Sequence, residues 1–95
     1  MASVRIYTTS WCSYCINAKR LLRENGIEFQ EIDIEQAGIS RKDLEKLTGR
    51  MTVPQIVVGD RPVGGYDDLL ILAEQGELHE IVKDELVGRD LQTAE

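Results

Sequence analysis

Two cysteines separated by two residues, Cys12 and Cys15, are the side chains of this sequence best suited to chemistry. An apolar run precedes them and helical periodicity follows, which predicts a strand that delivers both to the first turn of a helix. At that spacing the two sulfurs can approach within disulfide distance. Free N–H groups and the helix dipole stabilise a thiolate there, so Cys12 is expected to ionise below the ordinary pKa of a thiol.

A zinc site and a pair of inert buried cysteines are the alternatives to redox chemistry. Structural zinc needs four ligands, commonly Cys or His. The sequence has no second cysteine pair, and its only histidine, His79, stands alone. A Cys-x-x-Cys pair between a strand and a helix favours the redox interpretation over both.

The length of 95 residues predicts a single domain over residues 1–95, with a core over about 3–83. A hydrophobic share of 42% with 29% charged residues is typical of a globular protein. Periodicity is lost near the end of the chain, so residues 88–95 are expected to be mobile.

Composition also limits the compartment and the partners. No apolar run approaches the roughly 18 residues of a membrane span, and the first residues do not resemble a signal peptide, so we expect a cytoplasmic protein without a membrane partner. Two cysteines in a reducing compartment favour a catalytic role over a structural one. A net charge of −6 argues against a nucleic-acid partner, because phosphate binding needs a basic face.

Strands and helices are predicted to alternate, with short connections between them. Strands are expected over 4–8, 27–34, 55–58 and 61–63, and helices from Ser13 to Asn25, after Ser40 to Gly49, from Asp67 or Asp68 to Gly76, and over 78–86. Residues 40–43 have the spacing of a capping box. In an open α/β sheet, ligands lie at the carboxyl ends of parallel strands, where Cys12 is expected.

The second of these strands has an irregular pattern. Ile27 and Phe29 are out of phase with Ile32 and Ile34, which indicates either a bulge or a strand covered on both faces. The alternation of strands and helices favours the second explanation.

Three separated segments, residues 8–15, 52–56 and 64–69, resemble glutaredoxins in their order and approximate spacing. The resemblance covers essentially residues 3–83. It implies a thioredoxin-like α/β fold, with a four-stranded mixed sheet flanked by helices. It also implies glutathione-dependent exchange of disulfides, with glutathione as co-substrate and glutathionylated or disulfide-containing proteins as partners.

The resemblance assigns roles to the site residues. Cys12 is expected to attack the substrate disulfide, and Cys15 to resolve an intramolecular protein disulfide. A cis peptide before Pro54 is expected to bring the backbone of Val53, next to Thr52, beside Cys12, where it would pair with the cysteine of glutathione. On sequence alone the bond before Pro54 would be trans.

The two ends of glutathione are assigned to separate segments. Backbone N–H groups of Tyr66 and Asp67, after Gly65, are expected to bind the γ-glutamyl carboxylate, and the Asp67 side chain its ammonium group. A strand-to-helix turn with Asp67 as an ordinary N-cap is the alternative there. Arg41 is expected to bind the glycine carboxylate, or else to be a solvated helix residue, and Tyr14 is expected to shield one side of the groove.

The sequence departs from the commonest glutaredoxin pattern at Ser13, where proline is usual, and at Thr9, where a basic residue is usual. The smaller residue at Ser13 raises an alternative function, a [2Fe-2S] cluster held by Cys12 and glutathione from each of two subunits. The protein is expected to be a monomer, and a dimer if it binds a cluster. Trp11 is expected in the exposed loop before Cys12, where it either contacts partners or covers the helix start.

Overall fold

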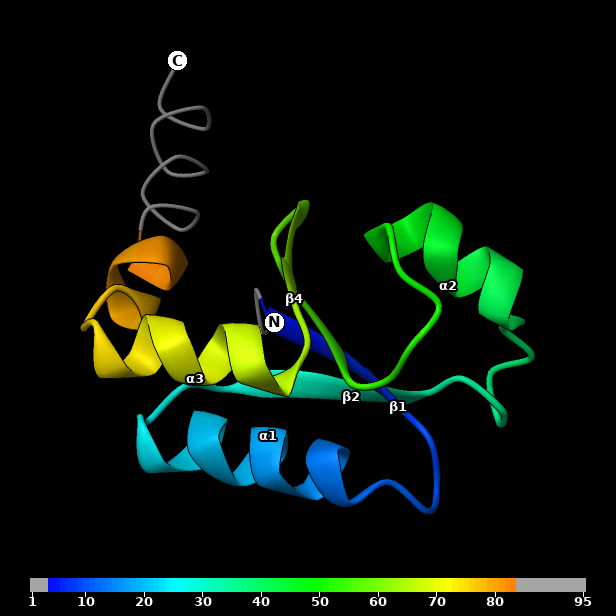
Figure 1. Ribbon diagram of the computed structural model, residues 1–95, viewed down its shortest axis with the longest axis horizontal. Helices are drawn as coiled ribbons and strands as arrows, with labels where there is room; N and C mark the ends of the chain where they lie inside the picture. Colours follow the sequence, from blue (N-terminus) through cyan, green and yellow to red (C-terminus); the bar gives the residue numbers. More distant parts are fainter. Residues whose placement is uncertain (1–3, 84–95) are drawn as a thin grey trace.

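The computed structural model describes residues 4–83, and its elements follow the predicted order (Figure 1). They are β1 (Val4–Thr8), α1 (Ser13–Glu24), β2 (Phe29–Asp33), α2 (Arg41–Thr48), β3 (Gln55–Val58), β4 (Arg61–Gly64) and α3 (Tyr66–Glu74), followed by a helical segment over 78–83. The predicted continuation of this last helix to Leu86 and the predicted mobile tail lie outside the described residues. No helix within residues 4–83 is both long and apolar enough to cross a bilayer.

The sheet is mixed, with the strand order β2-β1-β3-β4. β1 pairs in parallel with β2 and antiparallel with β3, and β4 pairs antiparallel with β3. This confirms the expected thioredoxin-like four-stranded sheet. Tyr7 is the register partner of Gln55, so the end of β1 that leads to Cys12 lies beside the start of β3, directly after Pro54.

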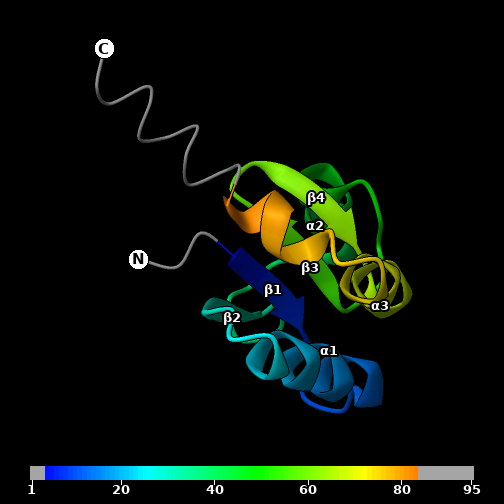
Figure 2. The same cartoon turned by 90° about the vertical axis from the view of Figure 1, so that its left-hand side faces the viewer.

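Helices cover both faces of the sheet, with α1 and α3 packed together on one side and α2 apart from them (Figures 1 and 2). The larger core cluster joins the first face to these helices and comprises Val4, Ile6, Ala18, Leu22, Ile27, Ile56, Val58, Leu69 and Leu78. The smaller cluster lies under α2 and comprises Tyr7, Ile34, Leu44 and Val57. Alternate residues of β1 and β3 therefore enter opposite clusters, which fixes the sheet between its two helical layers.

The irregular hydrophobic pattern around β2 arises because both faces of the strand are covered, and not from a bulge. Ile27 and Phe29 pack against the larger cluster, whereas Ile32 and Ile34 pack against the smaller one. The pairing of β2 with β1 is continuous, without a bulge. Both faces are thus covered, although the strand itself is shorter than predicted, Phe29–Asp33.

Two helix starts differ in how well the sequence predicted them. The capping box of α2 is confirmed, since Asp43 N–H donates to Ser40 Oγ at 3.0 Å and Ser40 N–H donates to Asp43 Oδ2 at 3.1 Å. The prediction that Asp67 or Asp68 caps α3 is wrong, because Gly65 is the N-cap and the helix begins at Tyr66. The Asp68 carboxylate instead accepts a hydrogen bond from Gly65 N–H at 3.0 Å, so it acts from inside the first turn.

Candidate active site

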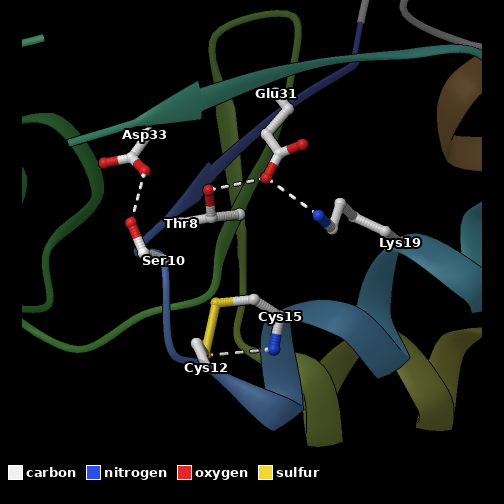
Figure 3. A network of polar contacts seen from close by, with 7 residues as sticks. All are labelled: Thr8, Ser10, Cys12, Cys15, Lys19, Glu31 and Asp33. Atoms are coloured by element: carbon white, nitrogen blue, oxygen red, sulfur yellow. Dashed lines mark hydrogen bonds and ion pairs between the residues drawn. A yellow bond between two sulfur atoms is a disulfide. The ribbon is translucent and has the colours of Figure 1, made fainter. Parts of the chain in front are cut away.

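Cys12 is the N-cap of α1 and is disulfide-bonded to Cys15 (Figure 3). Their Cα atoms are 5.1 Å apart, and Cys15 N–H donates to the sulfur of Cys12 at 3.1 Å. The sulfur therefore takes the place that a serine or aspartate oxygen takes at other helix starts. After reduction, the same N–H group and the helix dipole would favour a thiolate at this position.

The two cysteines differ in exposure. Cys12 is half-buried, whereas Cys15 is only 2% exposed and packs on the inner face of α1 with Ala18 and Leu22. An external reagent can therefore reach Cys12, while Cys15 is accessible mainly through its partner.

The loop before β3 brings Val53 to the cysteine pair. The peptide bond between Val53 and Pro54 is cis, as the resemblance implied. The carbonyl oxygen of Val53 is 3.8 Å from the sulfur of Cys12. A disulfide sulfur carries no hydrogen, so this is a contact and leaves the carbonyl group of Val53 open to another donor.

A hollow of about 370 Å³ opens on one side of Cys12, and we call it the Arg41 hollow. It is lined by Thr9, Trp11, Cys12, Ser13, Tyr14, Arg41, Thr52 and Val53. The guanidinium group of Arg41 donates to the carbonyl oxygen of Met51 at 3.0 Å, which ties the start of α2 to the loop that presents Val53. A cation thus lines the same hollow as Cys12.

A second hollow of about 300 Å³, the Asp67 hollow, lies next to the first. It is lined by Tyr14, Arg50, Thr52, Val53, Pro54, Gly65, Tyr66, Asp67 and Asp68. The rings of Tyr14 and Tyr66 stand 6.1 Å apart at an angle of 38° on its wall. Because both hollows share Tyr14, Thr52 and Val53, they lie side by side, and we call the two together the trough. Cys12 lines the Arg41 hollow, and each hollow has a size typical of small-molecule sites.

Every residue predicted to bind glutathione lines this trough, and Cys12 does as well. Cys15 does not line it and lies beneath. Arg41 and Asp67 belong to different hollows, so the two predicted ends of the ligand site are separated by the shared residues at its centre. The contribution of each residue to binding stays a prediction.

Sequence reasoning missed two charged residues of the Asp67 hollow as site residues. Arg50 pairs with Asp68 at 2.9 Å, and the same carboxylate oxygen accepts the hydrogen bond from Gly65 N–H. Gly64 has φ +119°, and a Cβ atom added there would collide with the carboxyl group of Asp68. The pair Gly64-Gly65 was the sequence signal for this contact, because a side chain can approach the backbone so closely only at a glycine.

The start of α3 provides hydrogen-bond donors to the trough. The first hydrogen bond within the helix runs from Leu69 N–H to Gly65 C=O. The N–H groups of Tyr66 and Asp67 therefore have no acceptor within the helix. Asp68 already holds the N–H group of Gly65. The helix end therefore presents free donors and a partial positive charge to an anion, beside the exposed carboxylate of Asp67.

A polar network holds the strands next to the cysteine loop (Figure 3). Glu31 Oε2 accepts a hydrogen bond from the buried Thr8 and pairs with Lys19 of α1, both at 2.9 Å. Burial acts to raise the pKa of Glu31, but the hydrogen bonds from Lys19 and Thr8 outweigh it and hold this pKa below its usual value. The network joins β1, β2 and α1, which together position Cys12.

The comparisons with known proteins agree with this geometry. The family model described as Glutaredoxin matches residues 4–63. A glutaredoxin of Pseudomonas aeruginosa is 49% identical over 78 residues, which is 82% of this chain and 93% of that protein. The crystal structure of the holo form of glutaredoxin C1 from Populus tremula x tremuloides has a TM-score of 0.80 at 28% identity, covering 88% of this chain and 86% of that one. The buckwheat glutaredoxin-glutathione complex has a TM-score of 0.78 at 25% identity, covering 87% and 78%.

Proposed function

This chain belongs to the glutaredoxin family of thiol-disulfide oxidoreductases, and we propose that it uses glutathione to reduce glutathione mixed disulfides and protein disulfides. The dithiol pair Cys12 and Cys15 provides the redox-active group. Glutathione is the co-substrate and occupies the trough formed by the Arg41 and Asp67 hollows. The buckwheat relative in complex with glutathione supports this choice of ligand.

The exchange of a mixed disulfide needs only Cys12. Its thiolate attacks the glutathione sulfur, a bond forms between these two sulfurs, and the bond between glutathione and the substrate breaks. The substrate leaves as a thiolate and takes a proton from water. The thiolate of a second glutathione then attacks the glutathione sulfur on Cys12, which releases oxidised glutathione and restores the Cys12 thiolate.

A protein disulfide can be reduced by the two-cysteine route. Attack by Cys12 leaves a mixed disulfide with the protein, and Cys15 then attacks the sulfur of Cys12. The protein departs with both sulfurs reduced, and the disulfide of Cys12 and Cys15 that remains is the one present in the structure. Two molecules of glutathione reduce it and become one molecule of oxidised glutathione.

The trough offers a complementary group to each part of glutathione. Arg41 can pair with the glycine carboxylate, and the free N–H groups of Tyr66 and Asp67 with the γ-glutamyl carboxylate. The Asp67 carboxylate can face the ammonium group. The backbone of Val53 can pair with the central cysteine and so direct its sulfur at Cys12, which is the orientation that exchange requires.

One observation carries the proposal: the two hollows meet at Thr52 and Val53, directly beside the sulfur of Cys12. The test is turnover of a cysteine-glutathione mixed disulfide, coupled to glutathione reductase and consumption of NADPH. Wild type is expected to turn over, and Cys12→Ser to be inactive while keeping its fold by circular dichroism. Turnover by Cys12→Ser, or reduction of the substrate without glutathione, would contradict the proposal.

A [2Fe-2S] cluster shared by two subunits is the second candidate function. It is favoured by the half-exposed position of Cys12 beside the exposed Ser13, a residue without the rigid ring of proline. Within residues 4–83, no group of three or more His, Cys, Asp or Glu side chains is suited to hold a metal. The remaining ligands would therefore be the sulfurs of bound glutathione and Cys12 of a second subunit.

Anaerobic reconstitution with iron, sulfide and glutathione tests the cluster. A cluster-binding protein is expected to gain visible absorbance and to elute as a dimer, and Cys12→Ser to stay colourless and monomeric. Ser13→Pro is the matched variant, expected to lower cluster yield while keeping disulfide exchange. A colourless wild-type monomer would contradict this candidate function.

A further inference from the structure

Gln55, the residue after Pro54, is almost fully buried, at 1% exposure. It begins β3 and is the register partner of the buried Tyr7, so its backbone is fixed in the sheet. Its Nε2 donates to Thr52 Oγ1 at 3.1 Å. Its Oε1 has no hydrogen-bond partner, and within residues 4–83 it is the only buried side-chain oxygen or nitrogen left in that state.

A buried amide with an unpartnered oxygen is unfavourable for folding alone, and an apolar side chain of similar size would avoid this cost. In the structure one N–H group of this amide donates to Thr52, while its second N–H group and its oxygen make no side-chain hydrogen bond among the described residues. The bond to Thr52 is the only side-chain hydrogen bond that Gln55 makes among the described residues.

This bond determines what the Thr52 hydroxyl can do. A hydroxyl group has one hydrogen to donate and two lone pairs to accept. Since Thr52 accepts from Gln55, its hydrogen points elsewhere, and it meets no acceptor within residues 4–83. Thr52 is exposed and lines both hollows. The remaining hydrogen is thus available to a ligand at the centre of the trough.

We propose that Gln55 is a positioning residue: its buried amide holds the Thr52 hydroxyl as a hydrogen-bond donor to a carboxylate or amide oxygen of the bound peptide. This inference rests on the proposed binding of glutathione in the trough. Gln55 does not touch the ligand and acts only through Thr52. The hydroxyl is oriented before the ligand arrives, so less rotational freedom is lost on binding.

The test is a double-mutant cycle on Gln55→Leu and Thr52→Val, with Thr52→Ser as the variant that keeps the hydroxyl. Turnover of the cysteine-glutathione mixed disulfide gives KM and kcat, and thermal unfolding gives Tm. Thr52→Val is expected to raise KM about three- to tenfold, as for one lost hydrogen bond, with kcat changed less than about twofold. Thr52→Ser is expected to stay within about twofold of wild type in both.

Gln55→Leu is expected to raise KM about two- to fivefold when Thr52 is present, and to cause no further rise in KM in the Thr52→Val background. Its Tm is expected to equal or exceed that of wild type, because the unpartnered oxygen is gone. Gln55→Met provides the same comparison with a flexible side chain if the leucine variant does not fold. A merely structural role would lower Tm and raise KM equally in both backgrounds.

Three results would overturn the inference while leaving the proposed function standing. They are an unchanged KM in Thr52→Val, an unchanged KM in Gln55→Leu, and an equal effect of Gln55→Leu with and without the Thr52 hydroxyl. Failure of the proposed function looks different, because wild type itself would then show no glutathione-dependent turnover.

Discussion

The sulfur of Cys12 lies 3.8 Å from the carbonyl oxygen of Val53, although the two residues are 41 positions apart in the sequence. The contact joins the start of α1 to the loop before β3, and the trough passes over this junction. A peptide held by the backbone of Val53 would therefore meet Cys12 and not the buried Cys15.

Cys15→Ser is expected to keep at least about half of the wild-type rate of mixed-disulfide exchange, because that route needs only the sulfur of Cys12. The same variant is expected to lose most of its activity on an intramolecular protein disulfide. Parallel assays with the two substrates check this, with Cys12→Ser inactive in both. Loss of mixed-disulfide exchange by a folded Cys15→Ser protein would contradict the assignment of roles.

Arg41→Ala is expected to raise KM for a glutathione mixed disulfide about three- to tenfold, since it removes a cation from the trough and its bond to Met51. Lys42→Ala is the control, because Lys42 is a neighbouring exposed cation that lines neither hollow. The difference in KM between the two variants is expected to shrink at 1 M salt, because charges are then screened over a distance of about 3 Å. Equal KM values for the two variants at low salt would speak against a role for Arg41.

Gly64→Ala is expected to destabilise the fold by about 2 kcal/mol or more, because it combines a positive φ with a collision against Asp68. Gly38→Ala is the matched control, since Gly38 also has a positive φ, +71°, but has open space around its Cα. That change is expected to cost about 1 kcal/mol. Urea unfolding measures both, and adding Asp68→Ala to Gly64→Ala should recover part of the loss. Equal costs at the two glycines would exclude the collision.

The capping box of α2 predicts a dependence of stability on pH. The hydrogen bonds from the backbone and then the side chain of Ser40 hold the pKa of Asp43 below its usual value. A carboxyl group whose pKa is lowered on folding stabilises the fold above its unfolded pKa, about 3.9, and loses this contribution as pH falls. Wild type is therefore expected to be more stable than Asp43→Asn at pH 7, with the difference shrinking below about pH 4.

Unfolding in urea between pH 7 and pH 3 measures this difference. Glu45→Gln, on the same helix, is the control, because the Glu45 side chain makes no hydrogen bond among the described residues and its substitution should leave the profile nearly parallel to wild type. A constant difference in the free energy of unfolding between wild type and Asp43→Asn over the whole pH range would contradict the role of the ionised carboxylate.

The sequence predicted most elements because their signals are local. Ser40 and Asp43 lie three residues apart, and Gly49 ends α2 in the left-handed conformation, so both ends of that helix can be identified without knowledge of the fold. The irregular phase of Ile27 and Ile34 also had a simple cause, because each enters a different core cluster. The resemblance added the cis bond before Pro54, which residue patterns alone would have made trans.

The missed features depend on contacts between distant segments. Asp68 resembles an N-cap in sequence, but Gly64 lets its carboxylate fold back onto Gly65 and the helix begins earlier. A glutamine at a strand start is ordinarily exposed, and only the pairing of Gln55 with β1 shows that its amide is enclosed. Leu47 fits the helical periodicity of the core yet is 50% exposed, because Thr48 occupies the buried position in the last turn of α2.

Trp11 is the only tryptophan of the chain, it is 98% exposed, and it immediately precedes the redox-active sulfur. An indole in that position gives the protein a built-in optical reporter. Its emission should be that of a fully hydrated ring, accessible to dissolved quenchers, and should brighten when the neighbouring sulfur-sulfur bond is opened. A polypeptide that settles over the cysteine loop would shift the emission to shorter wavelength, so each redox and docking event can be followed without a label.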